Sequence, residues 1–163
     1  MFRNYNETHM QLIQLIETST TRSDAKTSQY FDQYQQLLTE LNSRPLPENI
    51  CSSINAATKE LNASPLSGKP LLKLLKQKQT ESLKLLEKEL KLVPKHHYRN
   101  QWMLLGMSAF GIPLGVAIGT SIGNMGMLGI GLPIGMAIGM AVGTGMDKKA
   151  FDEGRQLQVE LKP

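Results

Sequence analysis

Four short patterns in this sequence of 163 residues contain groups that can do chemistry. Gly119-Thr-Ser-Ile-Gly123 matches G-x-S-x-G, the pattern in which a serine hydroxyl attacks a carbonyl carbon. His96 and His97 are adjacent imidazoles, and imidazole is a common zinc ligand. Gly68-Lys69 matches the Gly-Lys pair of a phosphate-binding loop, and Cys51 is the only thiol.

Each pattern lacks the neighbours that its chemistry needs. A nucleophilic serine needs a strand-to-helix elbow and a nearby base, whereas Ser121 lies in an apolar stretch and is predicted to bond the backbone of its own helix. No third or fourth ligand stands at useful spacing from the histidines, and Gly68 has no upstream glycine of a phosphate loop. Cys51 lies on an apolar face, and a single cysteine excludes a Cys-based zinc cluster. We therefore predict no enzymatic activity, no cofactor and no metal site.

Charge and glycine are unevenly distributed along the chain, whose net charge is +4. Residues 1–68 have a net charge of −2, residues 69–99 one of +6, and no ionisable side chain occurs from Asn100 to Met146. Twelve of the 14 glycines lie between Trp102 and Met146. This segregation excludes one evenly patterned soluble domain. Four parts are expected: a soluble helical region at 1–68, a basic amphipathic juxtamembrane helix at 69–101, a transmembrane hairpin at 102–146 and a cytoplasmic tail at 147–163.

Apolar residues at helical spacing dominate the first hundred residues, and no run of β-branched residues alternates convincingly, which predicts an all-α fold. A first short helix is expected around Met10, Ile13 and Ile16, with Leu12 and Leu15 beside them. A second helix is expected to start at Ser23 or Asp24, both favourable N-caps. Its core face is a stripe that also suits docking of a protein partner, if the protein does not bury it: Tyr30, Phe31, Tyr34, Leu37, Leu38 and Leu41. A third helix is expected to place four residues on one side: Ile50, Ile54, Ala57 and Leu61.

The segment from Leu71 to about Val93 is predicted to be an amphipathic helix. Its lysines fall within about 120° of arc, opposite a leucine-rich face: Lys73, Lys76, Lys84, Lys88 and Lys91. Two interpretations stay open, namely a solvent-exposed face on a helix of a small bundle, or a helix lying on anionic lipid. Nucleic-acid binding is not expected, because there is no recognition module and no aromatic interleaving.

Residues 102–146 carry the strongest signal in the sequence. Trp102–Gly123 and Met127–Met146 would be about 33 Å and about 30 Å long as helices, which matches a bilayer core. Asn124-Met125-Gly126 is the expected turn of a two-span transmembrane hairpin. Aromatic and charged residues flank the spans where a membrane interface is expected: Lys95, His96, His97, Tyr98, Arg99, Trp102, Lys148 and Lys149. The turn has no positive charge, so both termini are expected in the cytoplasm.

The two spans repeat each other with an offset of 20 residues, and nine of 18 aligned positions are identical. Each repeat has a row of glycines spaced by four: Gly111, Gly115, Gly119 and Gly123, then Gly131, Gly135, Gly139 and Gly143. Such rows form side-chain-free grooves through which helices pack in lipid. If the turn centres on Met125, Gly115 faces Gly135. Either both grooves are used inside one hairpin, or at least one receives a second protomer. Pro113 and Pro133 are expected to bend their helices.

The GxxxGxxxGxxxG rows and the exit segment Gly145–Leu157 resemble bacterial glycine-zipper membrane proteins over about residues 102–157. The resemblance implies a small integral membrane protein without catalytic residues. Met1–Glu7 is polar and precedes no apolar stretch with a cleavage site, so we expect no secretory signal or lipoprotein anchor. The expected location is the bacterial inner (cytoplasmic) membrane.

Two functions remain open from the sequence. The first is an anchor or scaffold, in which helices of residues 1–68 bind a protein partner and the hairpin holds the complex at the lipid bilayer. The second is permeabilisation of the membrane by hairpins that self-associate through their glycine grooves, as in a toxin, a defence effector or a holin-like factor. Few polar side chains occur in the spans, which favours the anchor.

Overall fold

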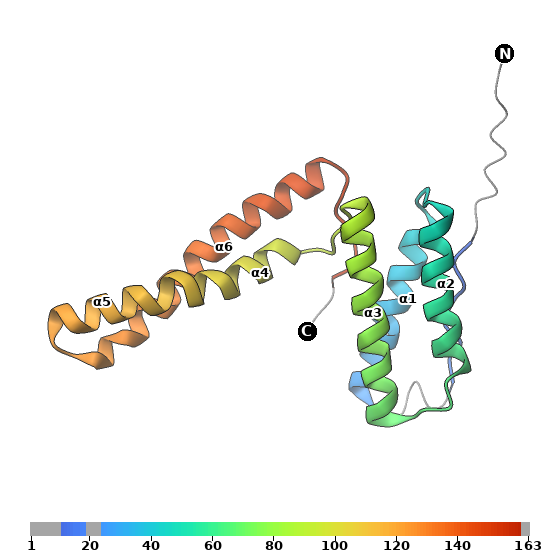
Figure 1. Ribbon diagram of the computed structural model, residues 1–163, viewed down its shortest axis with the longest axis horizontal. Helices are drawn as coiled ribbons and strands as arrows, with labels where there is room; N and C mark the ends of the chain where they lie inside the picture. Colours follow the sequence, from blue (N-terminus) through green and yellow to red (C-terminus); the bar gives the residue numbers. More distant parts are fainter. Residues whose placement is uncertain (1–10, 19–23, 161–163) are drawn as a thin grey trace, which may run out of the picture. The chain divides into compact units, whose positions relative to one another are not determined.

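The computed structural model describes residues 11–18 and 24–160. Its regular elements are helices, which confirms the predicted all-α class, and one isolated parallel bridge joins Val93 to Gln156. The chain divides into two compact units (Figure 1), the first ending at Leu92 and the second spanning Val93–Glu160. Each unit has its own way of packing helices.

The first unit contains α1 (Ala25–Asn42), α2 (Glu48–Ala63) and α3 (Gly68–Leu90). Asp24 caps α1 as predicted, because its carboxylate accepts from the amides of Lys26 and Thr27. α3 packs on both α1 and α2. The third helix is confirmed as α2, whose buried face includes Ile50, Ile54 and Leu61.

The core of the first unit consists of the α1 stripe and leucines of α3. Tyr34, Leu37, Leu38 and Leu41 are fully buried, and Phe31 nearly so. The condition for docking on this stripe is therefore not met, since the bundle itself buries it. Only the stripe's Tyr30 is partly exposed, with the Lys76 ammonium 4.6 Å from its ring centre.

The basic helix packs within the bundle. Its leucines Leu71, Leu75 and Leu86 are buried against the other helices, and its predicted lysine face is exposed. Lys78 forms a 2.6 Å ion pair with Glu60 of α2, and this hydrogen bond raises the pKa of Lys78. α3 ends at Leu90, earlier than predicted, because Lys91 adopts a left-handed conformation with φ 57°. The amides of Lys91 and Leu92 then bond back to α3, as in a Schellman cap.

The expected first helix around Met10–Ile16 does not form in the part that the structure describes. Residues 11–18 have no helical hydrogen bonds, and Leu12 and Leu15 are buried while Gln14 and Ile16 are exposed. A burial period of three is typical of an extended, polyproline-like chain. A helix this short is marginal by itself, and side chains of α1 and α2 bind the segment's backbone instead. Met10 lies outside the described residues.

The second unit is a helical hairpin. The first arm consists of α4 (His97–Gly106), a π-helical turn at Met107–Gly111 and α5 (Ile112–Ile122). A short 3-10 turn at Met125–Met127 leads into α6 (Leu128–Asp152), which returns along the first arm (Figure 1). The stretches His97–Ile122 and Gly129–Asp152 are long and apolar enough to cross a membrane. Only 22% of the most apolar part of each is buried, unlike the core helix of a soluble protein.

Candidate functional site

The two arms of the hairpin meet through glycine backbones. A β-carbon added at Gly131 would lie well inside 3.0 Å of backbone atoms of Gly111 and Gly115. One added at Gly135 would collide with the backbones of Gly106 and Gly111 in the same way. Real β-carbons essentially never approach backbone so closely, so these positions require glycine for steric reasons.

The same contact continues toward the open end of the hairpin. A β-carbon at Gly139 would meet the Trp102 carbonyl, and one at Gly143 would lie 2.5 Å from the Arg99 Cα atom. The structure thus brings all four predicted α6 glycines against the first arm. In the single chain, the α6 row is filled by backbone of the other arm. Self-association through these grooves stays a prediction.

The register differs from the predicted one by four to nine residues, which is between one and more than two helical turns. Gly135 lies against Gly106 and Gly111 rather than against Gly115. The turn also comes earlier than predicted: α5 ends at Ile122, and Gly123 takes a left-handed conformation with φ 70°. The first arm therefore ends before Met125, and the α6 glycines meet residues that lie four to nine positions earlier on the first arm than predicted.

Two predicted packing glycines belong to the turn. Gly119 is buried beneath it, where an added β-carbon would lie 3.3 Å from the Asn124 carbonyl oxygen. Gly123 is exposed and caps α5, with nothing near its missing side chain, so its assignment to the packing row is wrong. The Asn124 side chain accepts from the Gly126 amide at 2.9 Å, which stabilises the reversal as an Asx turn.

Gly106 is a packing residue that the spacing of four missed. It stands five residues before Gly111, one step out of phase with the row. The π-helical turn between them restores the phase, because it widens the helix so that the Ile112 amide bonds to the Met107 carbonyl five residues back. Pro113 follows at once and has no amide to donate. The proline and the odd glycine spacing are the sequence signals for this turn.

The outer surface of the hairpin is apolar. Large side chains point away from the glycine interface on both arms: Leu104, Leu105, Phe110, Ile112, Ile130, Ile134, Ile138 and Val142. The exposed hydroxyls of Ser108, Thr120 and Ser121 donate to carbonyls of their own helix at 2.7–3.1 Å, which confirms the prediction for Ser121. Hydroxyls satisfied within their helix carry little cost in a solvent without hydrogen-bonding partners.

The predicted interface residues gather at the open end of the hairpin. His96 (φ 59°) precedes α4, and the His97 and Tyr98 rings make an edge contact with centroids 5.1 Å apart. Lys148 and Lys149 are exposed on α6. They lie beside the first turn of α4, because their neighbour Asp147 accepts hydrogen bonds from the amides of that turn. Lys95, Arg99 and Trp102 are partly exposed. Both basic groups thus flank one end, and the uncharged turn forms the other.

Asp147 joins the two arms at this end, and sequence reasoning missed it. Its side chain is buried, and its two carboxylate oxygens accept from the Tyr98 and Arg99 amides at 3.0 Å each. These are N-terminal amides of α4, which have no partner within the helix. A carboxylate from α6 therefore caps α4 and favours its positive dipole end. Asp147 is the first ionisable residue after the second span, which was the available signal.

Backbone hydrogen bonds between Val93–Lys95 and Arg155–Val159 join the two ends of the hairpin next to Asp147. The Val93 amide donates to the Arg155 carbonyl at 3.0 Å, and the Leu157 amide donates back to Val93 at 2.8 Å. The Lys95 amide donates to Val159 at 3.1 Å. The side chains of Val93, Leu157 and Val159 are buried there, so this part of the predicted tail packs as a small apolar base.

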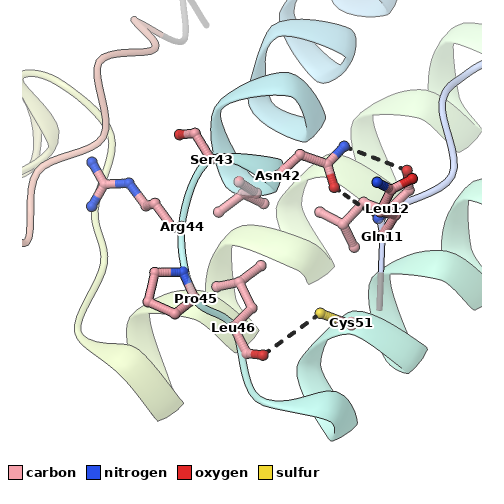
Figure 2. A pocket seen from close by; sticks show the side chains of 9 residues that line it. Gln11, Leu12, Asn42, Ser43, Arg44, Pro45, Leu46 and Cys51 are labelled. Carbon is pink, nitrogen blue, oxygen red and sulfur yellow. Dashed lines mark hydrogen bonds between the residues drawn. The ribbon is translucent and has the colours of Figure 1, made fainter. Parts of the chain in front are cut away.

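The first unit contains a cavity of about 510 Å³ next to Cys51 (Figure 2). Leu12, Asn42 and Leu46 line it, and the Cys51 thiol faces the Leu46 carbonyl at 3.9 Å. Burial raises the pKa of this thiol, which keeps it protonated and unreactive at neutral pH. Across residues 11–18 and 24–160, no three His, Cys, Asp or Glu side chains are grouped so that they could hold a metal ion.

The arrangement offers packing surfaces and backbone contacts. Ser121 bonds its own helix, and the His97 ring nitrogen contacts the Gln101 amide at 3.1 Å. No protein-family model, no curated protein and no solved structure matches this chain.

Proposed function

We propose that this protein is a non-enzymatic membrane anchor. Its glycine hairpin crosses the bilayer, and its helical bundle binds a protein partner at the membrane surface. The observation that carries the proposal is the inverted arrangement of the hairpin, with glycines inside and large apolar side chains outside. In water this arrangement would leave a long apolar surface exposed, whereas in lipid it costs nothing.

The ends of the hairpin support one orientation. Lys95, Arg99, Lys148 and Lys149 lie at the open end, and the turn around Asn124 is uncharged. Positive residues near short spans stay in the cytoplasm, so the bundle and the chain's end are cytoplasmic and the turn faces the other side. The proposed location in a bacterial cell is the inner membrane.

The glycine interface supports anchoring over permeabilisation. Within one hairpin the arms are in backbone contact, so no water-filled path runs between them. The hydroxyls on the outer surface are bonded within their helices and form no polar wall for a channel. A pore would need several hairpins to enclose a lumen with apolar surfaces.

The test combines membrane extraction with cysteine labelling of the full chain. Asn124→Cys in a Cys51→Ala background should react with a membrane-impermeant maleimide in intact cells. Lys149→Cys, the matched control at the other end, should react only after the cells are permeabilised. Both proteins should resist extraction by alkaline carbonate. Extraction into the soluble fraction would refute membrane insertion, and the reverse labelling pattern would refute the orientation.

A potential-sensitive dye separates the two functions in the same cells. An anchor accumulates without depolarising the membrane. If the dye reports depolarisation that begins with induction and precedes the arrest of growth, the anchor function is refuted and the permeabilising function is supported.

A further inference from the structure

The extended segment Gln11–Thr18 is held by side-chain amides of two helices. Gln35 and Asn42 lie on α1, and Asn55 and Asn62 lie on α2. Four amides of the segment donate to the oxygens of these side chains: Leu12 to Asn42 at 2.8 Å, Ile13 to Asn55 at 2.7 Å, Leu15 to Gln35 at 3.0 Å and Ile16 to Asn62 at 2.9 Å.

The three asparagines also donate to the segment's carbonyls. The amide nitrogen of Asn42 donates to the Leu12 carbonyl, that of Asn55 to the Gln11 carbonyl and that of Asn62 to the Gln14 carbonyl, at 3.1–3.4 Å. Each asparagine thus binds the main chain with both its donor and its acceptor. These seven bonds involve only the main chain of the segment. The Gln35 amide also donates to the side-chain oxygen of Gln14, which is the one polar contact of this set that depends on the segment's sequence.

The spacing of the amides fits an extended chain. Gln35 and Asn42 are seven residues apart on α1, and Asn55 and Asn62 are seven apart on α2. Seven helical residues span about 10.5 Å, and three extended residues span about 9–10 Å. The paired amides therefore contact segment residues three apart on both helices. The segment runs antiparallel to α1 and parallel to α2.

The segment occupies a groove between the two helices. Among the described residues, α1 and α2 approach α3 closely but do not approach each other. Figure 1 shows the segment beside α1 and α2. Leu12 and Leu15 are buried, 4% and 8% exposed, whereas Ile16 is 61% exposed. The groove thus buries two apolar side chains three residues apart, while Ile13 is half-buried and Ile16 stays exposed.

We propose that the groove between α1 and α2 is a peptide-binding site whose ligand is an extended segment of a partner protein. The segment carries leucine-like residues at positions i and i+3, and the chain's own Gln11–Thr18 occupies the site until the partner displaces it. This inference deepens the proposed function, on which it rests, because it gives the anchored bundle a site for its partner.

Three observations commit the site to a partner protein. Seven hydrogen bonds reach only the main chain of the segment, so a foreign segment can form the same seven bonds. The apolar stripe of α1 is buried and leaves the bundle no other predicted docking face. The cavity of Figure 2 also adjoins Gln11 and Leu12, and both polar and apolar residues line it, so a site with room for further side chains continues beyond this end of the groove.

The probe is a fluorescent peptide with the segment's own sequence, Gln-Leu-Ile-Gln-Leu-Ile-Glu-Thr. It is titrated into the full chain in detergent micelles, followed by anisotropy. The variant Leu12→Ala/Leu15→Ala weakens the internal competitor and should bind the peptide at least tenfold more tightly than the native chain does, because a tethered segment competes at a high effective concentration. Adding Asn55→Ala and Asn62→Ala to this variant should lower the affinity at least tenfold.

The control peptide carries serine in place of both leucines and should bind at least tenfold more weakly. If the leucine variant does not fold, native chain supplies the second measurement. Excess peptide should then speed hydrogen exchange at the amides of residues 12–16 at least tenfold. A folded variant without saturable binding, together with unchanged exchange in the native chain, would overturn the proposal.

The experiment also distinguishes a second copy of this chain from a partner protein, and failure of this proposal from failure of the anchor. A native dimer that the peptide dissociates would show that a second copy of this chain occupies the groove, and would overturn the partner assignment. Because the assay is done in micelles, loss of peptide binding leaves the carbonate and labelling results for the anchor unaffected, and failure of the anchor leaves the peptide result unaffected.

Discussion

The helices of the bundle meet through large side chains, whereas the arms of the hairpin meet through their backbones. In the bundle, Leu37, Leu38 and Leu86 are fully buried between helices. In the hairpin, glycines fill the interface and isoleucines point outward. Water drives leucines into the first interface, and this drive is absent between helices in lipid, where close contact of small residues takes its place. Removing side-chain volume from the interface should therefore destabilise the bundle, whereas adding it should destabilise the hairpin.

The largest effect is expected from adding two methyl groups inside the hairpin. Gly131→Ala together with Gly135→Ala places β-carbons against the backbones of Gly111 and Gly106. Overpacking costs about 1–3 kcal/mol per site, and rigid backbone cannot move aside, so we expect a loss of more than about 3 kcal/mol. Trp102, the only tryptophan, lies at this interface and reports unfolding in an SDS titration by its fluorescence. An unchanged transition would show that the glycines do not hold the arms together.

Removing side-chain volume should be the damaging change in the bundle. Leu38→Ala deletes a fully buried side chain and leaves a cavity, so we expect a loss of about 3 kcal/mol. Urea unfolding followed by far-ultraviolet circular dichroism measures it. Leu66→Ala, at an exposed position outside the helices, is the matched control and should change stability by less than about 0.5 kcal/mol. Equal losses for both variants would contradict the bundle core described above.

The carboxylate between the arms should have an intermediate effect. Asp147→Ala leaves the Tyr98 and Arg99 amides without acceptors at a buried helix end, so we expect a loss of about 1–2 kcal/mol in the Trp102 transition. Asp147→Asn keeps one acceptor and should lose about half as much. Asp152→Ala, an exposed acidic position on the same helix, is the control and should have little effect.

The smallest effect has the opposite sign. Gly145 lies on α6 with nothing within 4 Å of its missing β-carbon. Gly145→Ala therefore gains helix propensity without a collision and should stabilise the hairpin by about 0.5–1 kcal/mol. The same substitution on the same helix thus changes sign between Gly135 and Gly145. Destabilisation at Gly145 would mean that this face of α6 packs against something.

Much of the architecture follows from residue spacing. The apolar stripe and Asp24 cap predict α1, and the glycine rows with the charge-free stretch predict two apolar arms and their turn. These signals repeat over several helical turns, so one ambiguous residue does not change the outcome.

Features that depend on a single residue or on partners distant in sequence were not predictable. The apolar spacing of the first segment fits a helical period and a three-residue extended period equally well, since its apolar residues are Leu12, Ile13, Leu15 and Ile16. Asparagines 30 to 46 residues away decide between these periods, and no local pattern shows them. The cap by Asp147 is likewise set by a contact between the two arms. The register of the arms also differs from the predicted one, since it depends on contacts along the full length of both arms.

The amide spacing on α1 and α2 has a consequence for alignment along the groove. Sliding the segment by three residues brings an equivalent set of main-chain groups to Gln35, Asn42, Asn55 and Asn62, so the backbone alone allows several alignments. Each such slide puts Thr18 or His9 where a leucine was. Losing one buried leucine costs about 2 kcal/mol, or about a thirtyfold preference. The main chain thus sets the step at three residues, and the leucine pair selects a single alignment among the steps.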